Sequence, residues 1–410
     1  MHYTYRHTMK ACYLGYITQA IVNNLAPLLF IVFQNEFAIS FEKIGRLVLM
    51  NFATQILVDL FAVRYADRIG HRRLVVSAHV FCVVGLVGMG VLPRILPDAY
   101  SGLVIAAMLY AVGGGLIEVL ISPIVEALPG DAKASAMSLL HSFYCWGQMT
   151  VVLMTTLLLW ALGNAIWPYL CALWALVPLL NIFLFSKVPL APPLATGEKR
   201  TSIRELLKSR VFVIALVLMM CAGASELTMS QWSSLFAEKG LGVSKVVGDL
   251  LGPCLFAVLM GLGRMLYGLF GERINLGRAM LLSGALCVVC YLMTIFGTHP
   301  AISLVGCAVC GLSVALMWPG ALSMTAARYP TGGTAMFGMM AVFGDVGASL
   351  GPWLAGLASD LAQESALIQQ RAQATGLSLD QLGLKCGLLL GCVFPIIMLV
   401  GLMLFRKSRA

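Results

Sequence analysis

The sequence predicts an all-α membrane protein with twelve transmembrane helices in two pseudo-symmetric bundles of six. Two observations carry this prediction, the composition and the spacing of the apolar runs. Of the 410 residues, 60% are apolar and 11% are charged, whereas a soluble domain is roughly 45–50% apolar and about 25% charged. Too few charges remain to cover a soluble surface. A span needs roughly 20 apolar residues, so this length accommodates twelve spans and their loops.

Apolar runs between polar breaks place the individual spans. The polar stretch 187–209 divides the chain into an N-terminal bundle (1–186), a linker and a C-terminal bundle (210–410). A second polar stretch, 360–383, is expected to form a short amphipathic helix outside the bilayer. The expected spans are 11–35, 44–64, 73–93, 101–127, 135–162, 165–186, 210–236, 247–270, 277–297, 300–327, 332–359 and 384–405.

The basic residues predict the orientation. Of the 27 Lys and Arg, 20 fall in the gaps on the side that holds both termini, which the positive-inside rule assigns to the cytoplasm. We therefore expect a multi-pass protein of the cell (inner) membrane with cytoplasmic termini and a cytoplasmic linker. The first apolar run is too long for a signal-peptide core and is expected to be the first span. The other seven basic residues are Lys43, Arg46, Arg94, Lys239, Lys245, Arg371 and Lys385.

Several functional classes are disfavoured by the sequence. The net charge of +9 is scattered between the spans, so no nucleic-acid partner is expected. No nucleotide-binding glycine loop or Ser-His-Asp arrangement is present. We therefore expect that the protein is not an enzyme and needs no cofactor. The pairs Cys287/Cys290 and Cys307/Cys310 lie in apolar runs. We expect them to pack as small hydrophobes, with a metal or redox site as the alternative.

The two halves resemble each other in three places, as expected of a transporter built from structural repeats. Residues 59–73 align with 264–278, which places Asp67-Arg68-Ile69 on Glu272-Arg273-Ile274. Residues 115–123 align with 311–319, and 146–148 align with 343–345. The matches keep their order along the chain.

The segment AlaAspArgIleGlyHisArgArg at 66–73 resembles the loop signature of the major facilitator superfamily. This resemblance implies the major facilitator fold and a cytoplasmic gate that uses Asp67, Arg68 and Arg72. An alternative is that these charges only anchor the loop in water. The copy departs from the usual pattern at Val63, Tyr65 and His71.

Three segments are similar to the fucose permease group of sugar:proton symporters. They are ValAsnAsnLeu with GlnAsnGluPhe (22–25, 34–37), GlyLeuIleGlu with SerPro (115–118, 122–123), and HisSerPheTyrCysTrpGly (141–147). The resemblance implies a proton-coupled symporter that takes up a sugar or sugar-like polar solute by alternating access. Pro27 stands where the group has an acid in span 1, so a two-acid scheme does not carry over. The alternative is a proton-driven efflux pump for amphipathic compounds or metabolites.

Three acids lie deep within expected spans. Inserting an ionisable side chain there costs roughly 2.5–3.5 kcal/mol, so such residues are usually functional. The three acids are Glu118, Glu226 and Asp345, each beside glycines. We expect all three to contact substrate, against the alternative of buried structural hydrogen bonds. Glu118 matches the acid of the fucose permease group and is the predicted site of proton coupling. Coupling to Na⁺ instead of H⁺ stays open.

A sugar site also needs amides that hydrogen-bond to the sugar hydroxyls and aromatic rings that pack against its C–H groups. The expected partner is a small-molecule substrate, in a monomeric protein surrounded by membrane lipid and without a metal. Packing and interfacial placement are the alternatives for the tryptophans. The further candidate substrate-binding residues are Asn23, Asn24, His141, Trp146, Gln148 and Trp232.

Overall fold

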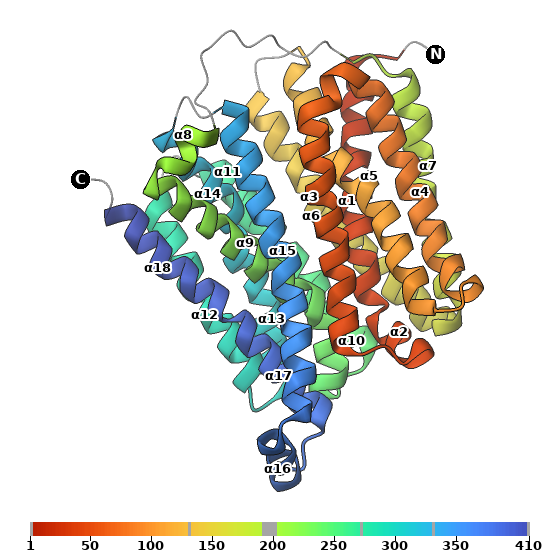
Figure 1. Cartoon of the computed structure of the whole chain (residues 1–410), viewed down its shortest axis with the longest axis vertical. Helices are drawn as coiled ribbons and strands as arrows, with labels where there is room; N and C mark the ends of the chain where they lie inside the picture. Colours follow the sequence, from red (N-terminus) through yellow and green to blue (C-terminus); the bar gives the residue numbers. More distant parts are fainter. Residues whose placement is uncertain (1–2, 130–132, 191–202, 271–273, 330–332, 408–410) are drawn as a thin grey trace. The chain divides into compact units, whose positions relative to one another are not determined.

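The structure is a computed structural model that describes residues 3–129, 133–190, 203–270, 274–329 and 333–407. Within these ranges the chain is helical, and no strand occurs (Figure 1). Ten helices are long and apolar enough to span a membrane, and α1 (Tyr5–Leu28) with α2 (Phe30–Phe37) forms one further span bent by 44°. With α15 (Gly333–Glu364), 32 residues long, the described helices account for the twelve predicted spans.

The described chain groups into two compact units. One contains residues 1–38 and 50–197, and the other contains 39–49 and 198–410. The start of α3 (Phe41–Ile69) therefore packs with the second unit. The division into bundles at 187–209 stays a prediction, and that stretch includes a short helix, α8 (Ile203–Lys208), which the sequence did not predict.

In the first unit, α1 packs mainly against α5 (Ala99–Ala127), α6 (Lys133–Leu162) and α7 (Trp167–Lys187). Helix α4 (His71–Ile95) packs between α5 and α7. Small residues permit these contacts, since a Cβ on Gly85 would overlap the backbone of Tyr110, and one on Gly113 would overlap Ala78. The result is a tightly packed bundle whose polar side chains lie inside.

In the second unit, α9 (Arg210–Leu235) packs against α15 and against α14 (Met317–Arg328) and α18 (Val393–Lys407). Helix α15 also packs on α17 (Leu379–Gly391), and α12 (Leu276–Phe296) packs on α13 (Pro300–Val314). The exposed α16 (Ala366–Thr375), with no buried residue, extends beyond α15 and α17. It falls within the stretch where the sequence predicts a short helix.

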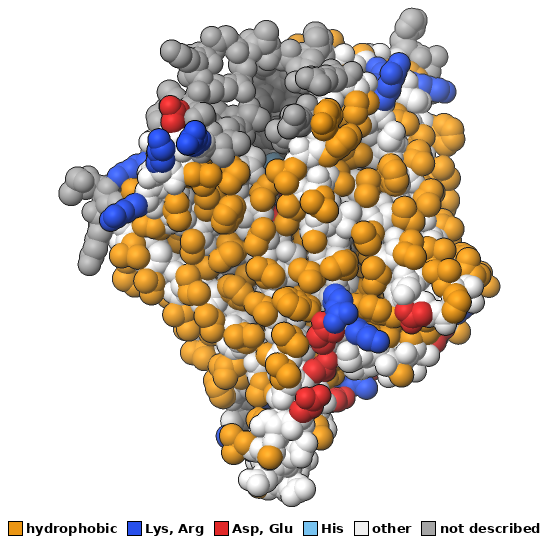
Figure 2. Space-filling view, viewed as in Figure 1, with side chains coloured by type: hydrophobic (Ala, Val, Ile, Leu, Met, Phe, Trp, Pro, Cys, Tyr) orange, Lys and Arg blue, Asp and Glu red, His pale blue; other side chains and the backbone are white. Residues whose placement is uncertain are grey.

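Two spans contain π-helical turns. The turn η2 (Phe236–Gly240) extends α9, and η3 (Leu250–Cys254) joins α10 (Lys245–Asp249) to α11 (Leu255–Phe270). Such turns are rare and occur frequently at functional sites. On the face shown in Figure 2, hydrophobic side chains cover the helices, and charged ones gather near helix ends.

The first residues of α3 are held on α15 inside the second unit. The Asp360 carboxylate accepts the Glu42 backbone N–H at 2.7 Å, and Trp353 Nε1 donates to Glu42 Oε1 at 2.9 Å. A Cβ on Gly45 would lie 3.0 Å from the Pro352 oxygen, so the two helices cross at close range. This segment is fixed by hydrogen bonds to α15 as well as by apolar packing.

The packing predicts opposite effects for two glycines of α15. A Cβ on Gly347 would overlap the Met220 carbonyl of α9, whereas one on Gly338 meets nothing within 4 Å among the described residues. Gly347→Ala should lower the melting temperature of the purified protein, since overpacking costs roughly 1–3 kcal/mol. Gly338→Ala should leave it unchanged or raise it, because Ala favours a helix by about 1 kcal/mol over Gly. Equal melting temperatures for the two variants would contradict the α9–α15 packing.

Candidate functional site

Five side chains from three helices of the first unit form one hydrogen-bonded network. Gln19 Nε2 on α1 lies 3.1 Å from Glu118 Oε2 on α5 and 3.0 Å from Gln55 Oε1 on α3. Gln55 Nε2 donates in turn to Asn23 Oδ1 at 3.0 Å, and Asn51 Nδ2 donates to the same oxygen at 3.1 Å. The predicted residues Glu118 and Asn23 are thus linked through amides that the prediction did not include.

Helical spacing brings the network together. Gln19 and Asn23 are four residues apart on α1, and Asn51 and Gln55 are four apart on α3, so each pair lies on one helix face. Two glycines of α5, Gly114 and Gly115, lie against these polar faces of α1 and α3. A Cβ on Gly114 would lie 3.1 Å from Gln19 Oε1, so α5 approaches closely enough for Glu118 to reach the amides.

Five buried amide oxygens in this unit accept no hydrogen bond from any described residue. They are the side-chain oxygens of Gln19, Gln34, Asn51, Gln148 and Asn181, of which those of Gln19 and Asn51 belong to the network. Gln148, predicted as a ligand, is buried on α6 with 2% of its surface exposed. A buried acceptor without a donor is costly, so these oxygens suit a ligand that brings hydroxyl or amine hydrogens.

The other predicted ligands of the first unit lie on α1 and α6. Asn24 Nδ2 donates to the Ala20 carbonyl at 2.9 Å and lies 3.3 Å from the Tyr144 hydroxyl. His141 is exposed, and its ring packs edge-on against Tyr16 at 5.1 Å between centroids. Trp146 is half-buried.

In the second unit, Glu226 pairs with an arginine of the next span. Its Oε2 lies 3.4 Å from a guanidinium nitrogen of Arg264 on α11, and both side chains are largely buried. Asp345 on α15 is buried with 2% exposed. The Trp232 indole N–H donates to the Pro352 carbonyl at 3.1 Å, and its ring packs edge-on against Phe41. The indole N–H of Trp232 is therefore already hydrogen-bonded to the backbone of α15.

A second charged cluster joins α9 to α10. Lys245 Nζ lies 2.8 Å from Asp249 Oδ2, whose carboxylate also accepts the Ser234 hydroxyl hydrogen. Asp249 is fully buried, and the cluster lies between the two π turns. The pair is neutral as a whole, which reduces the cost of holding charges within a span.

The predicted gate is described only in part. Arg72 donates to the carbonyl oxygens of Phe185 and Val188 at 2.8 and 2.7 Å. It thereby joins the start of α4 to the end of α7, where a cation also interacts favourably with the helix dipole. The side chains of Asp67 and Arg68 lie outside the described residues.

The four cysteines of the two predicted pairs are all buried. Cys287 and Cys310 approach to 3.8 Å between sulfur atoms, and both are buried and free. Among the described residues no group of three or more His, Cys, Asp or Glu has a metal-binding arrangement.

Sequence reasoning missed five residues of these clusters, although a signal existed for most of them. Polar residues every four positions in an apolar span, as at 51, 55 and 59 or at 245 and 249, indicate one polar face on a buried helix. The pairing of Arg264 with Glu226 depends on how α9 and α11 are rotated about their axes. The missed residues are Gln19, Asn51, Gln55, Lys245 and Asp249.

The geometry defines a polytopic helical membrane protein that encloses polar and charged side chains within its spans. A family model described as the Major Facilitator Superfamily matches residues 12–352. The chain belongs to the Major Facilitator Superfamily. This assignment confirms the predicted fold of twelve helices in two bundles and makes the protein a multi-pass membrane transporter by family.

Solved structures share the fold. A bacterial homologue of the human lysosomal transporter Spinster, inward-facing and occupied, is 14% identical over 97% of this chain and 96% of its own, with a TM-score of 0.78. A D-xylose-proton symporter is 16% identical over 95% of both chains, at 0.70. The nucleoside transporter NupG, as a mutant, is 11% identical over 97% and 98%, at 0.74. No curated protein matches the sequence.

The buried pair of the second unit predicts a stability effect. Lys245→Met leaves the Asp249 carboxylate buried without its cation, and removing one partner of a buried pair costs roughly 3–5 kcal/mol. The melting temperature should fall clearly, and adding Asp249→Asn should restore part of the loss. Lys239→Met, in the adjacent π turn, is the control and should change little. A Lys245→Met protein as stable as the wild type would contradict the ion pair.

Proposed function

We propose that this protein is a proton-coupled symporter that takes up a sugar or sugar-like polar solute by alternating access. In this proposal residues 1–186 rock against 210–410, and the protein lies in the inner membrane with cytoplasmic termini. The observation that carries the proposal is the Gln19–Glu118 hydrogen bond within a network of amides. This bond joins a titratable carboxyl to side-chain amides, which can donate to and accept from the hydroxyls of a polar solute.

The network supports a polar, hydrogen-bonding substrate. Amides donate and accept, so they can exchange partners with sugar hydroxyls at little cost. The buried acceptors at Gln19, Asn51 and Gln148 favour a solute that is rich in donors. A site built to hold apolar or amphipathic compounds gains nothing from such groups, because each unpaired buried oxygen is penalised.

Glu118 has the properties of a proton carrier. It is one hydrogen bond away from the amide network, and burial disfavours the charged form of a carboxyl. Loading a proton would remove the charge that Gln19 stabilises and change the hydrogen bonds open to substrate. The repeat places Val314 at the matching position of the second half, so a purely architectural role would not need an acid here.

Glu226 is proposed to contact the substrate from the second unit. Its 3.4 Å separation from Arg264 is long for a charge-assisted hydrogen bond, which is usually 2.7–2.9 Å. A substrate hydroxyl can therefore compete for the carboxylate, with Arg264 holding it in position. The proposed set of ligands is completed by Asn24, His141, Trp146, Trp232 and Asp345.

A thermal-shift screen tests the class of substrate. Sugars and other polar metabolites, added singly to purified protein, should raise its melting temperature in a saturable manner, because ligand binding stabilises the folded state. The screen is run at two pH values with and without Na⁺, which separates the two coupling ions. Shifts by amphipathic compounds alone would support the competing function, a proton-driven efflux pump.

Glu118→Gln tests proton coupling. The amide keeps the shape and can accept the hydrogen bond from Gln19, but it neither gains nor loses a proton near neutral pH. Uptake into proteoliposomes driven by a pH gradient should be abolished, while substrate exchange at equal pH should persist. Glu364→Gln, an exposed position at the end of α15, is the control. Concentrative uptake by the Glu118→Gln protein would assign coupling to another residue, with Glu226 or Asp345 tested next.

Glu226→Ala tests the contact with substrate. Binding should weaken about tenfold, equivalent to roughly 1.4 kcal/mol, beyond any change in melting temperature. Arg264→Met serves for comparison, since it leaves Glu226 in place. Normal substrate affinity in the Glu226→Ala protein would mean that Glu226 serves the structure alone.

A further inference from the structure

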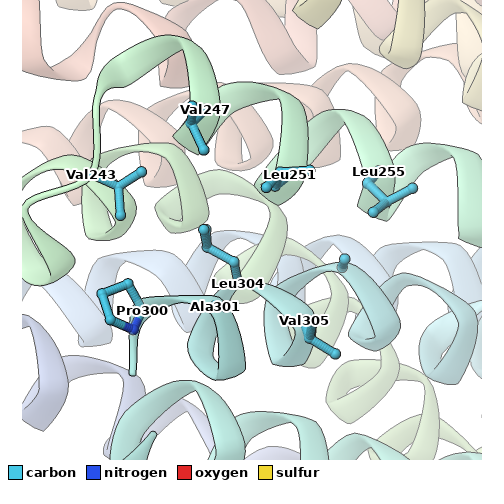
Figure 3. Close-up of a pocket in the computed structure, with 9 residues that line it drawn as sticks. Val243, Val247, Leu251, Leu255, Pro300, Ala301, Leu304 and Val305 are labelled. Atoms are coloured by element: carbon cyan, nitrogen blue, oxygen red, sulfur yellow. The ribbon is translucent and has the colours of Figure 1, made fainter. Parts of the chain in front are cut away.

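An apolar groove of about 340 Å³ lies between the α10–η3–α11 span and α13 (Figure 3). One wall consists of Val247, Leu251 and Leu255, spaced four residues apart along the α10–η3–α11 span, with Val243 in the loop that precedes α10. Figure 3 shows these side chains facing α13 across the groove. Every lining residue is apolar, so the groove suits neither water nor the polar solute proposed above.

The opposite wall is formed by the first turns of α13. Pro300, Ala301, Leu304 and Val305 supply it, and the short side chains of the proline and alanine leave space. On its other side, the α10–η3 segment is held close to α9, because Gly248 faces Ala237 and Gly252 faces Ser233. Close packing against α9 and small residues on α13 together keep the groove open.

The groove faces the surroundings of the protein. Val247, Leu251 and Val305 are 40, 43 and 50% exposed, although they belong to helices long and apolar enough to be membrane spans. In a membrane-embedded chain this exposed side meets hydrocarbon. An occupant must therefore be a molecule dissolved in the bilayer.

The length of the groove fits a chain within one leaflet. Eight residues separate Val247 from Leu255, which is about 12 Å along a helix, and Val243 extends the wall to the start of α10. One leaflet contributes about half of the 30 Å hydrocarbon core. Pro300 is the first residue of α13, so one end of the groove opens where both helices begin.

We propose that this groove binds one acyl chain of a membrane lipid, which enters from the leaflet where α10 and α13 begin. The chain fills the space between the two helices and contacts both walls. Binding depends on close van der Waals contact, because hydrocarbon outside the groove is as apolar as its lining. This lipid site is separate from the network of the first unit and does not depend on the identity of the transported solute.

Photolabelling tests the site. Full-length protein in detergent is titrated with a phosphatidylcholine that carries a diazirine in the middle of one acyl chain, and adducts are mapped by mass spectrometry. Adducts should concentrate at 243–255 and 300–308, saturate with lipid, and fall with excess unlabelled phosphatidylcholine. Ala301→Phe, which places a ring in the groove, should reduce this labelling about tenfold, equivalent to roughly 1.4 kcal/mol.

Matched variants separate specific binding from general contact with lipid. Ala285→Phe, at an exposed position of α12 outside the groove, should leave the labelling unchanged. Val247→Phe blocks the groove from the opposite wall and should reduce the labelling as Ala301→Phe does. If one of the two variants has an abnormal melting temperature, the other still tests the site. Labelling spread evenly over all exposed helices, or labelling that persists in both groove variants, would overturn the proposal.

Discussion

The structure depends on one constraint, the lack of water in the core of a bilayer. A polar group that leaves water there must find its partner within the protein, so backbone groups bond within helices and buried side chains bond to one another. The first unit meets this constraint with amides. Asn and Gln both donate and accept, so the chain of bonds from Asn51 through Asn23, Gln55 and Gln19 extends across two helices. It ends on Glu118, whose hydrogen-bond partner, Gln19, is therefore a buried side chain of the same unit.

The second unit meets the same constraint with charges. Glu226 and Arg264 pair between α9 and α11, and Lys245 and Asp249 pair within one turn beside Ser234. Desolvating two ions is costly unless their geometry is good. The 2.8 Å contact of Lys245 meets that condition better than the 3.4 Å contact of Arg264. The looser pair is the one on which the proposed substrate contact rests, since a group that is imperfectly satisfied can accept a new partner.

Much of the fold could be predicted because the length of each apolar run shows where the chain can span the membrane. The twelve runs overlap the helices, and a helix also occupies 366–375. The bend at Leu29, the π turns and α8 could not be predicted, since they are local departures from regular spacing. The site was predicted by residue type rather than by contact. Glu118 and Asn23 stand out as polar residues in apolar spans, but their link through Gln19 and Gln55 depends on how each helix is rotated. In uniformly apolar spans, side-chain patterns specify that rotation only weakly.

Helix α3 combines two kinds of contact along its length. Its first residues are grouped with the second unit, and its residues from Met50 on are grouped with the first. Near its start, Glu42 bonds to Asp360 and Trp353 of α15 through its backbone N–H and its carboxylate. Two turns further on, Asn51 and Gln55 bond to Asn23 and Gln19 of α1. The rotation of α3 about its axis must satisfy both sets of bonds at once, because a helix turns as one body through its own backbone hydrogen bonds. The contacts with α15 therefore help to fix which side of α3 presents Asn51 and Gln55 to the amide network.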